Sequence, residues 1–223
     1  MDNGSRCDAD SQNPQCSDDG RYVVYETVDN PFAVGGYTKV GDGNGADIIL
    51  RDMDQANVSL TLVSHIPANE KTGVENATTP ADSACTNPCI SDDGNFVAYQ
   101  SKCGNSIVAT PPGLTDGKWA IYRWNRQNTP ATASTYACAD TTGGEPAGVG
   151  DSEEPCINSD GSMVGFTSDS PLGLATVEGG KNVYVNNLNS GLETNYIAFD
   201  YATNKKTAQN ITIDDAGKYV AFD

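Results

Sequence analysis

One short stretch of the sequence has the residue types and the spacing of a metal-binding loop. Asp42, Asn44 and Asp47 are separated by glycines and alanine, and all three offer oxygen atoms. Oxygen ligands spaced in this way can wrap a hard cation such as Ca²⁺. The other ligands of a full EF-hand loop are missing, and the same residues suit a Gly/Asn-rich turn between two strands. Two interpretations therefore stay open, a calcium site and a plain turn, and we expect no other cofactor.

Paired carboxylates are the second candidate for chemistry. Asp18-Asp19, Asp92-Asp93 and Glu153-Glu154 could in principle supply the two acids of a glycoside hydrolase. The aspartate pairs, however, stand at one fixed place in a repeated phrase, which favours a role in shaping turns. His65 is the single histidine, so a Ser-His-Asp triad or a two-histidine metal site has little to be built from. We therefore predict that the protein is not an enzyme.

Three aromatic residues on one run could form a ligand platform. Trp119, Tyr122 and Trp124 lie close together in the sequence, and positions 122 and 124 would share one face of a strand. Exposed rings of this kind stack on sugars, whereas buried rings pack between sheets. The sequence favours packing in the core and leaves a glycan site open as the alternative.

Seven cysteines are many for a cytosolic chain of this length, and their spacing matches no zinc template. We therefore expect disulfides and an oxidising compartment, although a sequence does not fix the connectivity. Positions around hairpins and loops suggest the pairs Cys85–Cys103, Cys138–Cys156 and Cys7–Cys16. Cys89 would then remain, either buried or paired with another subunit.

These residues must be positioned by a repeat that occurs four times along the chain. Its copies are Cys16–Tyr25, Ile90–Tyr99, Ile157–Phe166 and Ile213–Phe222. Each copy contains a turn rich in Asp and Ser, a glycine that closes the turn, and a run of β-branched and aromatic residues. Asp and Ser bond their own backbone in turns and glycine supplies positive φ, so each copy predicts a β-hairpin. Repetition of this kind is typical of repeat architectures.

Further strands follow each complete hairpin. A third strand is expected at residues 46–52, 119–125 and 182–187, and a fourth, weaker strand at residues 59–64, 133–137 and 194–199. No stretch sustains the periodicity of an amphipathic helix. Four antiparallel strands in each repeat are typical of a β-propeller blade.

The repeated phrase resembles the blade motif of TolB-like, WD-like β-propellers, which runs roughly Pro-x-Ile-Ser-x-Asp-Gly-x-Tyr-Val-Ala-Phe. Residues 41–52 also resemble a segment common in secreted bacterial members of this family. The resemblance covers residues 13–223 and implies an all-β propeller of four-stranded antiparallel blades. We expect a single domain, 1–223, with complete blades at about 13–66, 86–138 and 153–200 and a partial fourth at 209–223. Such propellers serve as binding modules, enzyme domains and scaffolds, so the resemblance does not specify a function.

The fourth repeat contains only its first two strands, which would leave an unpaired strand edge. Propellers usually close at least four blades into a ring. Three interpretations are open. The chain could be part of a longer propeller, copies could complete blades across a subunit boundary, or residues 1–12 could supply the missing strands.

The formal net charge is −17 with a pI near 4.1, which argues against nucleic acid as a partner. No apolar run is long enough for a transmembrane helix, so we expect no membrane insertion, and no signal peptide is recognisable. Four asparagines match the glycosylation sequon, which is meaningful only in a glycosylating host. They are Asn3, Asn57, Asn76 and Asn210.

Taken together, these features predict an extracellular or periplasmic, non-enzymatic binding or scaffold propeller. Its partners would be a protein, a glycan, or further copies of itself that associate through open blade edges. Two alternatives remain. One is a structural subunit of an extracellular filament or surface layer, and the other is the accessory propeller of a hydrolase or of a carbohydrate-binding protein.

Overall fold

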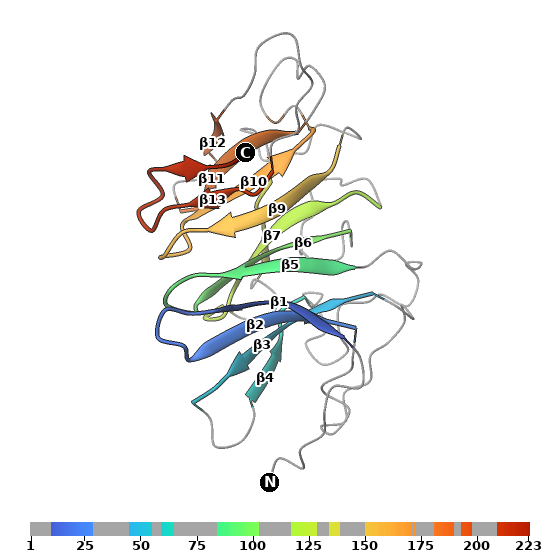
Figure 1. Cartoon of the computed structure of the whole chain (residues 1–223), viewed down its shortest axis with the longest axis vertical. Coiled ribbons are helices and arrows are strands. Elements are labelled where there is room, and N and C mark those ends of the chain that lie inside the picture. Colours follow the sequence, from blue (N-terminus) through green and yellow to red (C-terminus); the bar gives the residue numbers. More distant parts are fainter. Residues whose placement is uncertain are drawn as a thin grey trace.

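The computed structural model shows a fan of antiparallel sheets that follow one another along the chain (Figure 1). The structure describes residues 10–28, 45–54, 59–64, 84–102, 117–128, 134–138, 150–170, 172, 181–189, 193–197 and 209–223. Within these ranges all regular structure is β-strand, and none of it is a helix that could cross a lipid bilayer.

Three sheets have four strands each, in the order in which the strands occur in the sequence. The first contains β1 (Ser11–Cys16), β2 (Tyr22–Thr27), β3 (Asp47–Asp52) and β4 (Ser59–Leu62). The second contains β5 (Cys85–Ile90), β6 (Phe96–Ser101), β7 (Ala120–Asn125) and β8 (Ser134–Tyr136). The third contains β9 (Ser152–Ile157), β10 (Met163–Ser168), β11 (Asn182–Asn187) and β12 (Glu193–Ile197). These strands confirm the strand positions expected from the repeat.

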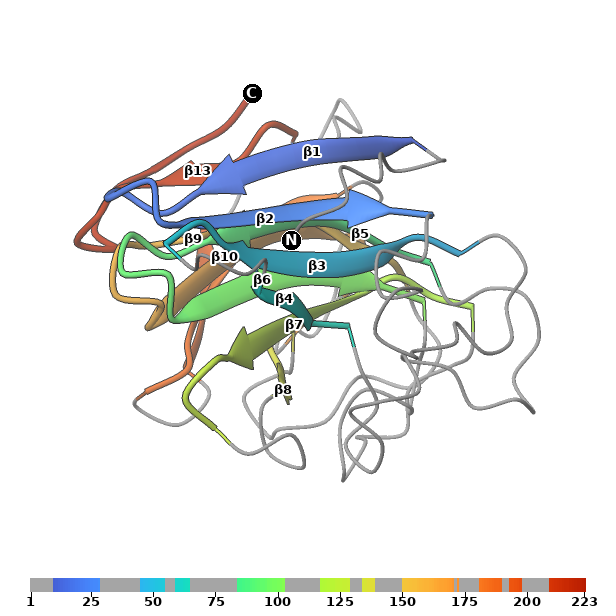
Figure 2. The same ribbon diagram turned by 90° about the horizontal axis from the view of Figure 1, so that it is seen from below.

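The fourth repeat forms a two-stranded hairpin of β13 (Thr212–Ile213) and β14 (Val220–Ala221). The hairpin turns of all four sheets gather along one edge of the fan (Figure 1). Figure 2 shows the four strands of the first sheet succeeding one another from β1 to β4. The fold is therefore that of a β-propeller, with three four-stranded blades and the inner hairpin of a fourth among the described residues.

A β-bulge interrupts the first strand of each blade at the same place. The pairing register shifts between Gln12 and Gln15 in β1, and equivalent shifts occur in β5 and β9. The bulge residue adopts positive φ, between 49° and 56°, a conformation in which asparagine is several-fold enriched. Asn13, Asn87 and Glu154 lie at the three bulges, and Asn210, just before β13, has the same positive φ.

The core lies between successive sheets, because the second and third strands of each blade carry apolar residues on both faces. Tyr99 and Tyr122 are fully buried and stack with ring centroids 5.8 Å apart, and Phe166 stacks on Tyr184 at 5.7 Å. Full burial of such a side chain contributes roughly 1.5–3 kcal/mol. The first blade differs from the others in its first strand, because every residue of β1 is exposed.

Candidate binding site at the hairpin turns

The turn of each hairpin is held by the same network of side chains. In the first blade the Ser17 hydroxyl donates to Asp19 Oδ1 at 2.6 Å and accepts the Tyr22 N–H at 3.0 Å. Asp19 Oδ1 also accepts the Arg21 N–H at 2.9 Å. Equivalent bonds recur in the next two turns, which use Ser91 with Asp93 and Asn158 with Asp160. The acidic residues of the repeated phrase therefore shape the backbone.

The fourth turn reaches the same geometry with a different residue. Ala216 stands where the earlier turns have an aspartate, so the second acceptor is missing there. Asp214 Oδ1 compensates, because it accepts both the Lys218 N–H at 2.6 Å and the Tyr219 N–H at 2.7 Å. One carboxylate thus replaces a Ser–Asp pair.

Hydrogen bonds lower the pKa of the acids that close the turns. A side-chain hydrogen bond from Ser17 is the main cause for Asp19, and one from Ser162 is the main cause for Asp160. Both carboxylates are therefore ionised at neutral pH and occupied by donors, which suits a structural role better than proton transfer.

Backbone hydrogen bonds join each turn to the next one. The Asp18 N–H donates to the Asp92 carbonyl at 3.0 Å, and the Asp92 N–H donates to the Ser159 carbonyl at 3.0 Å. The Ser159 N–H completes the series on the Asp215 carbonyl at 3.4 Å. All three bonds run in the same direction, from the N–H of one blade to the C=O of the following blade.

This convergence brings acidic side chains near one another. The pKa of Asp92 is raised, first by burial and then by repulsion from Asp215, Asp18 and Asp93. Even so, the described ranges contain no group of three His, Cys, Asp or Glu side chains arranged to hold a metal ion. The turns therefore form a closely packed, charged end of the fan. The contacts between neighbouring turns are the candidate binding surface.

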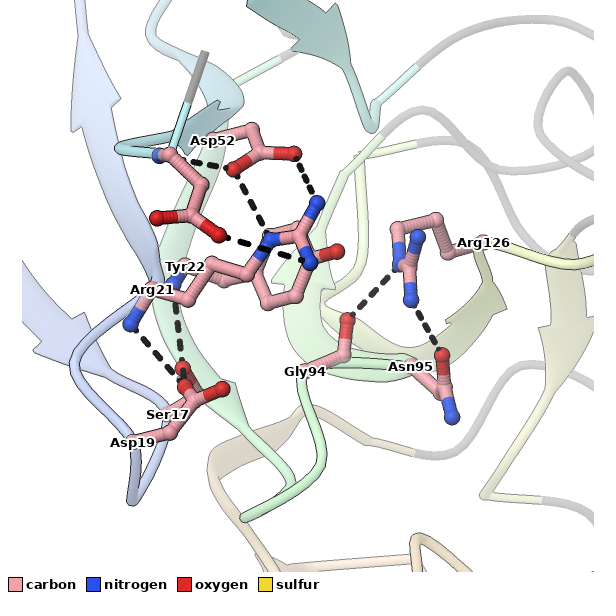
Figure 3. A network of polar contacts seen from close by, with 9 residues as sticks. Ser17, Asp19, Arg21, Tyr22, Asp52, Gly94, Asn95 and Arg126 are labelled. Carbon is pink, nitrogen blue, oxygen red and sulfur yellow. Dashed lines mark hydrogen bonds and ion pairs between the residues drawn. The ribbon is translucent and has the colours of Figure 1, made fainter.

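The first such contact places an aromatic ring on a glycine of the next blade (Figure 3). A Cβ atom added at Gly94 would lie 2.2 Å from Tyr22 Cδ2, so only glycine leaves room for the ring. The Arg126 guanidinium lies 4.4 Å from the centroid of the Tyr22 ring, and its Nε donates to the Gly94 carbonyl at 3.2 Å. The Arg21 guanidinium also lies over this ring, 4.9 Å from its centroid. Asp52 holds that guanidinium by accepting two hydrogen bonds from it, at 3.1 and 2.9 Å.

We call the large side chain that packs on the next blade's turn glycine the knob, and the contact between two consecutive blades a joint. The same contact of knob and glycine recurs at the next two joints. A Cβ at Gly161 would lie 2.3 Å from Phe96 Cδ2, and one at Gly217 would lie 2.7 Å from Met163 Cγ. At the Phe96 joint a cation again covers the ring, since Arg123 lies 4.8 Å from its centroid and donates to the Gly161 carbonyl at 2.7 Å. Burial lowers the pKa of Arg123, whose guanidinium nonetheless stays charged at neutral pH.

A third contact between blades satisfies the backbone N–H of three of the residues with positive φ. Glu26 Oε2 accepts the Asn87 N–H at 2.8 Å, and Gln100 Oε1 accepts the Glu154 N–H at 2.9 Å. At the last joint Glu154 Oε2 accepts the Asn210 N–H at 3.2 Å. Sequence reasoning missed these acceptors, although the bulge residues recur four positions before each turn and could have indicated them.

The first and last turns of the array each have one half of these contacts. Gly20 is the first-blade counterpart of Gly94, and a Cβ there would meet nothing within 4 Å. Tyr219 is the last-blade counterpart of Tyr22 and is 75% exposed, whereas Tyr22 is 5% exposed. The two ends of the described array are therefore complementary.

The predicted calcium ligands are only partly described. Asp42 and Asn44 lie outside the described residues. Asp47 begins β3 and is buried, and its Oδ1 accepts a hydrogen bond from the Ser64 hydroxyl at 3.1 Å. The calcium site stays a prediction. His65 and the sequon residues Asn3, Asn57 and Asn76 also lie outside the described ranges.

The three predicted platform residues lie on and beside β7. Tyr122 is fully buried and Trp124 is 4% exposed, so both rings pack in the core. Trp119 is half-buried, and the Lys102 ammonium lies 4.8 Å from its ring centroid. A sugar would therefore find only Trp119 accessible in this conformation.

No disulfide joins two cysteines of the described residues. Cys138 and Cys156, one of the expected pairs, are both thiols and not a disulfide in the structure. Cys138 Sγ instead accepts the Ile121 N–H at 3.1 Å. Cys7 and Cys103, the expected partners of Cys16 and Cys85, lie outside the described residues.

Cys89 and Cys156 occupy equivalent places in consecutive blades, opposite the small residues Ala98 and Gly165. Burial raises the pKa of the Cys89 thiol, and the nearby Cys156 adds to the effect. Burial also raises the pKa of Cys156 to about 12. Both thiols are therefore protonated and weakly reactive at neutral pH.

Comparison with known proteins finds similar structures but no related sequence family. No family model matches the chain, and no curated protein matches it by sequence. A putative TolB from Agrobacterium tumefaciens is similar over 83% of this chain and 48% of its own, with 16% identity and a TM-score of 0.44. A prolyl endopeptidase matches 92% of this chain and 23% of its own, with 12% identity and a TM-score of 0.47. A puromycin-hydrolysing peptidase of Mycobacterium tuberculosis matches 94% and 35%, with 11% identity and a TM-score of 0.43. The chain thus spans less than half the length of each of these structures.

Proposed function

We propose that this chain is a non-enzymatic binding or scaffold propeller that works outside the cytoplasm and binds an extended protein segment beside β14. The observation that carries the proposal is the edge of β14. In the complete blades the second strand pairs with a third strand along its whole length, as β2 pairs with β3. Within the described residues β14 pairs only with β13.

The edge of β14 includes a backbone carbonyl that is hydrogen-bonded in the complete blades. The Arg21 carbonyl accepts the Met53 N–H at 2.7 Å, and the Asn95 carbonyl accepts the Arg126 N–H at 2.8 Å. Lys218 occupies the same position in the fourth hairpin, and no described residue donates to its carbonyl. An extended segment that added a strand beside β14 would satisfy it, which is binding by β-augmentation.

The side chains of β14 support the same interpretation. Val24 and Ala98 are fully buried in the complete blades, whereas their counterpart Ala221 is exposed. Unpaired apolar edges bind other strands readily, and proteins usually protect them. An acidic surface with a net charge of −17 keeps the rest of the molecule soluble while the edge binds.

A peptide titration tests this proposal. A fluorescent peptide with the sequence of residues 45–54, which contains the third strand of the first blade, should bind the intact chain with saturable anisotropy. A peptide of the same sequence, N-methylated on alternate amides, should not bind, because it cannot extend the ladder. Equal binding of both peptides, or binding of neither, would contradict edge recognition.

A further inference from the structure

The first three hairpin turns share a pair of residues that is chemically reactive. Aspartate stands directly before the turn glycine at Asp19–Gly20, Asp93–Gly94 and Asp160–Gly161. Glycine is required at this place, because the three glycines adopt φ of +69°, +68° and +70°. An aspartate before glycine is the one most open to attack by the following backbone nitrogen, since glycine has no side chain to obstruct the approach. Each turn therefore combines a necessary glycine with a vulnerable aspartate.

The reaction forms a five-membered succinimide ring and needs no oxidant or cofactor. The amide nitrogen of the glycine bonds to Cγ of the neutral aspartic acid, and the carboxyl hydroxyl leaves as water together with the amide proton. One molecule of water then opens the ring at either carbonyl. Opening at one carbonyl restores aspartate, and opening at the other yields isoaspartate, whose main chain contains one extra carbon atom.

The folded hairpin occupies both reacting groups of the first pair. The Gly20 N–H donates to the Ser17 carbonyl at 2.9 Å, and ring closure would remove this bond because the imide nitrogen carries no proton. Asp19 Oδ1 accepts the Ser17 hydroxyl at 2.6 Å and the Arg21 N–H at 2.9 Å (Figure 3). The bond from Ser17 is the main cause that lowers the pKa of Asp19, so less of the reactive neutral acid is present at a given pH.

The second and third turns hold the same two groups. The Gly94 N–H donates to the Ser91 carbonyl at 2.9 Å, and Asp93 Oδ1 accepts the Ser91 hydroxyl at 2.6 Å. Asn158 takes the place of serine in the third turn. Its carbonyl accepts the N–H of the turn glycine at 3.1 Å, and its Nδ2 donates to Asp160 Oδ1 at 2.9 Å. A hydroxyl and an amide therefore engage the aspartate in the same way.

The fourth turn keeps the glycine but has no aspartate before it. Ala216 precedes Gly217, whose N–H donates to the Asp214 carbonyl at 2.9 Å. The carboxylate that closes this turn belongs to Asp214. The Gly217 nitrogen cannot close a five-membered ring with that carboxylate, because the two residues are not adjacent. The fourth turn is therefore an internal reference without the reactive pair.

We propose that Asp19, Asp93 and Asp160 are latent sites of isoaspartate formation, which the hydrogen bonds of each turn keep unreactive while the hairpin stays folded. The reactive state is the opened turn, in which the glycine N–H and the carboxylate are both released. An isoaspartate would add a main-chain atom three residues before the knob, so it would also disturb the joint with the next blade. The inference is independent of the proposed function, because it concerns turns of the complete blades.

Ageing of the folded and of the unfolded chain tests the proposal. Samples kept at neutral pH with and without urea are digested and mapped, since aspartyl and isoaspartyl peptides have equal mass and separate by chromatography. Isoaspartate should appear at all three sites in urea, and at least about tenfold more slowly in the folded chain, because opening a turn breaks several hydrogen bonds. The peptide that contains Ala216–Gly217 should form the least isoaspartate in urea. Equal rates in the folded and unfolded chain would overturn the proposal.

Each turn is followed on its own peptide. Asp42–Gly43 and Asp116–Gly117 could also react, and their aspartates lie outside the described residues. A measurement of total isoaspartate would therefore mix these sites with the three turns.

Substitution of one serine tests whether the hydrogen bonds of a turn protect that turn. Ser17→Ala removes a donor to Asp19 and should raise isoaspartate formation at Asp19 roughly tenfold in the folded chain. Asp93 and Asp160 in the same molecule should keep their slow rates. Ser17→Asn is the matched control, because Asn158 has this role in the third turn, and it should react as slowly as the unmodified chain.

The three sites of one molecule separate local opening from loss of the whole fold. An equal rise at all of them in Ser17→Ala would mean that the reaction proceeds through global unfolding, which contradicts the proposal. An unchanged rate at Asp19 in Ser17→Ala, or equal rates in Ser17→Ala and Ser17→Asn, would also contradict it. Ser91→Ala repeats the test at Asp93 in the second blade, and circular dichroism checks that each variant is folded.

Discussion

The glycines of the turns allow the packing between blades to be measured with a matched pair of substitutions. Gly20 and Gly94 have nearly the same backbone conformation, with φ of +69° and +68°. An alanine at either position adopts a left-handed conformation that costs roughly 1–2 kcal/mol. Only at Gly94 does the new methyl group also meet a neighbour, at 2.2 and 2.8 Å from two atoms of the Tyr22 ring.

The size of the second effect follows from how firmly the ring is held. Tyr22 is 5% exposed, and two guanidinium groups lie over its ring, with Arg21 at 4.9 Å and Arg126 at 4.4 Å from the centroid. Overpacking a rigid site costs about 1–3 kcal/mol. We therefore expect Gly20→Ala to lower the free energy of unfolding by roughly 1–2 kcal/mol and Gly94→Ala to lower it by roughly 2–5 kcal/mol.

Urea unfolding followed by circular dichroism measures both values under identical conditions. A second test uses Tyr22→Ala, which should relieve the clash when it is combined with Gly94→Ala. The double-mutant cycle should then give a coupling energy of roughly 1–3 kcal/mol. Equal destabilisation by Gly20→Ala and Gly94→Ala would refute the argument that the ring and the glycine fix the joint.

Four further predictions follow from the turns and the thiols. Asp214→Ala should lower stability by about 1–2 kcal/mol, because two backbone N–H groups lose their acceptor, and urea unfolding beside Ala216→Ser as a neutral control measures this. The pKa of Asp160 is lowered in the folded state, so its stabilising effect is complete above the ordinary value of 3.8 and is lost as pH falls through the lower folded pKa. Asp160→Asn should therefore lower the urea midpoint at pH 7 and should leave it unchanged once the pH lies below the folded pKa. The pKa of Asp92 is raised, so its charge destabilises the fold above that pKa, and Asp92→Asn should stabilise the protein at pH 7 by a few tenths of a kcal/mol, a gain that shrinks with salt and disappears below pH 3.8. At neutral pH a thiol reagent should label exposed Cys16 quickly and Cys89 and Cys156 slowly in the folded protein, and peptide mapping that found equal rates would contradict the burial of the two thiols.

The sequence was sufficient for the features that depend on short-range contacts. The turn phrase predicted the hairpins because its hydrogen bonds join residues two to five positions apart, as Ser17 does with Asp19 and Tyr22. Runs of β-branched and aromatic residues predicted the strands, because this signal also lies in residues that are neighbours in the sequence. The turn aspartates were also interpreted correctly as structural, since they recur with the hairpin.

Contacts between repeats were harder to predict. The place of Tyr22 over Gly94 depends on how two blades pack, and no local pattern states which glycine meets which ring. A signal was present nonetheless, because a large side chain follows two residues after each turn glycine. The structure shows no bond between Cys138 and Cys156, and the pairs that include Cys7 and Cys103 stay predictions. Asp42 and Asn44 lie outside the described ranges, so the structure does not test the calcium prediction.

The shared direction of the hydrogen bonds from turn to turn has an evolutionary consequence. Each blade offers the same donor on one side and the same acceptor on the other, as Asp92 does between Asp18 and Ser159. A gene that gained or lost one blade by unequal recombination would therefore encode a protein whose new junction is already compatible. Blade number can change in such a lineage while the backbone hydrogen bonds across the seam are kept.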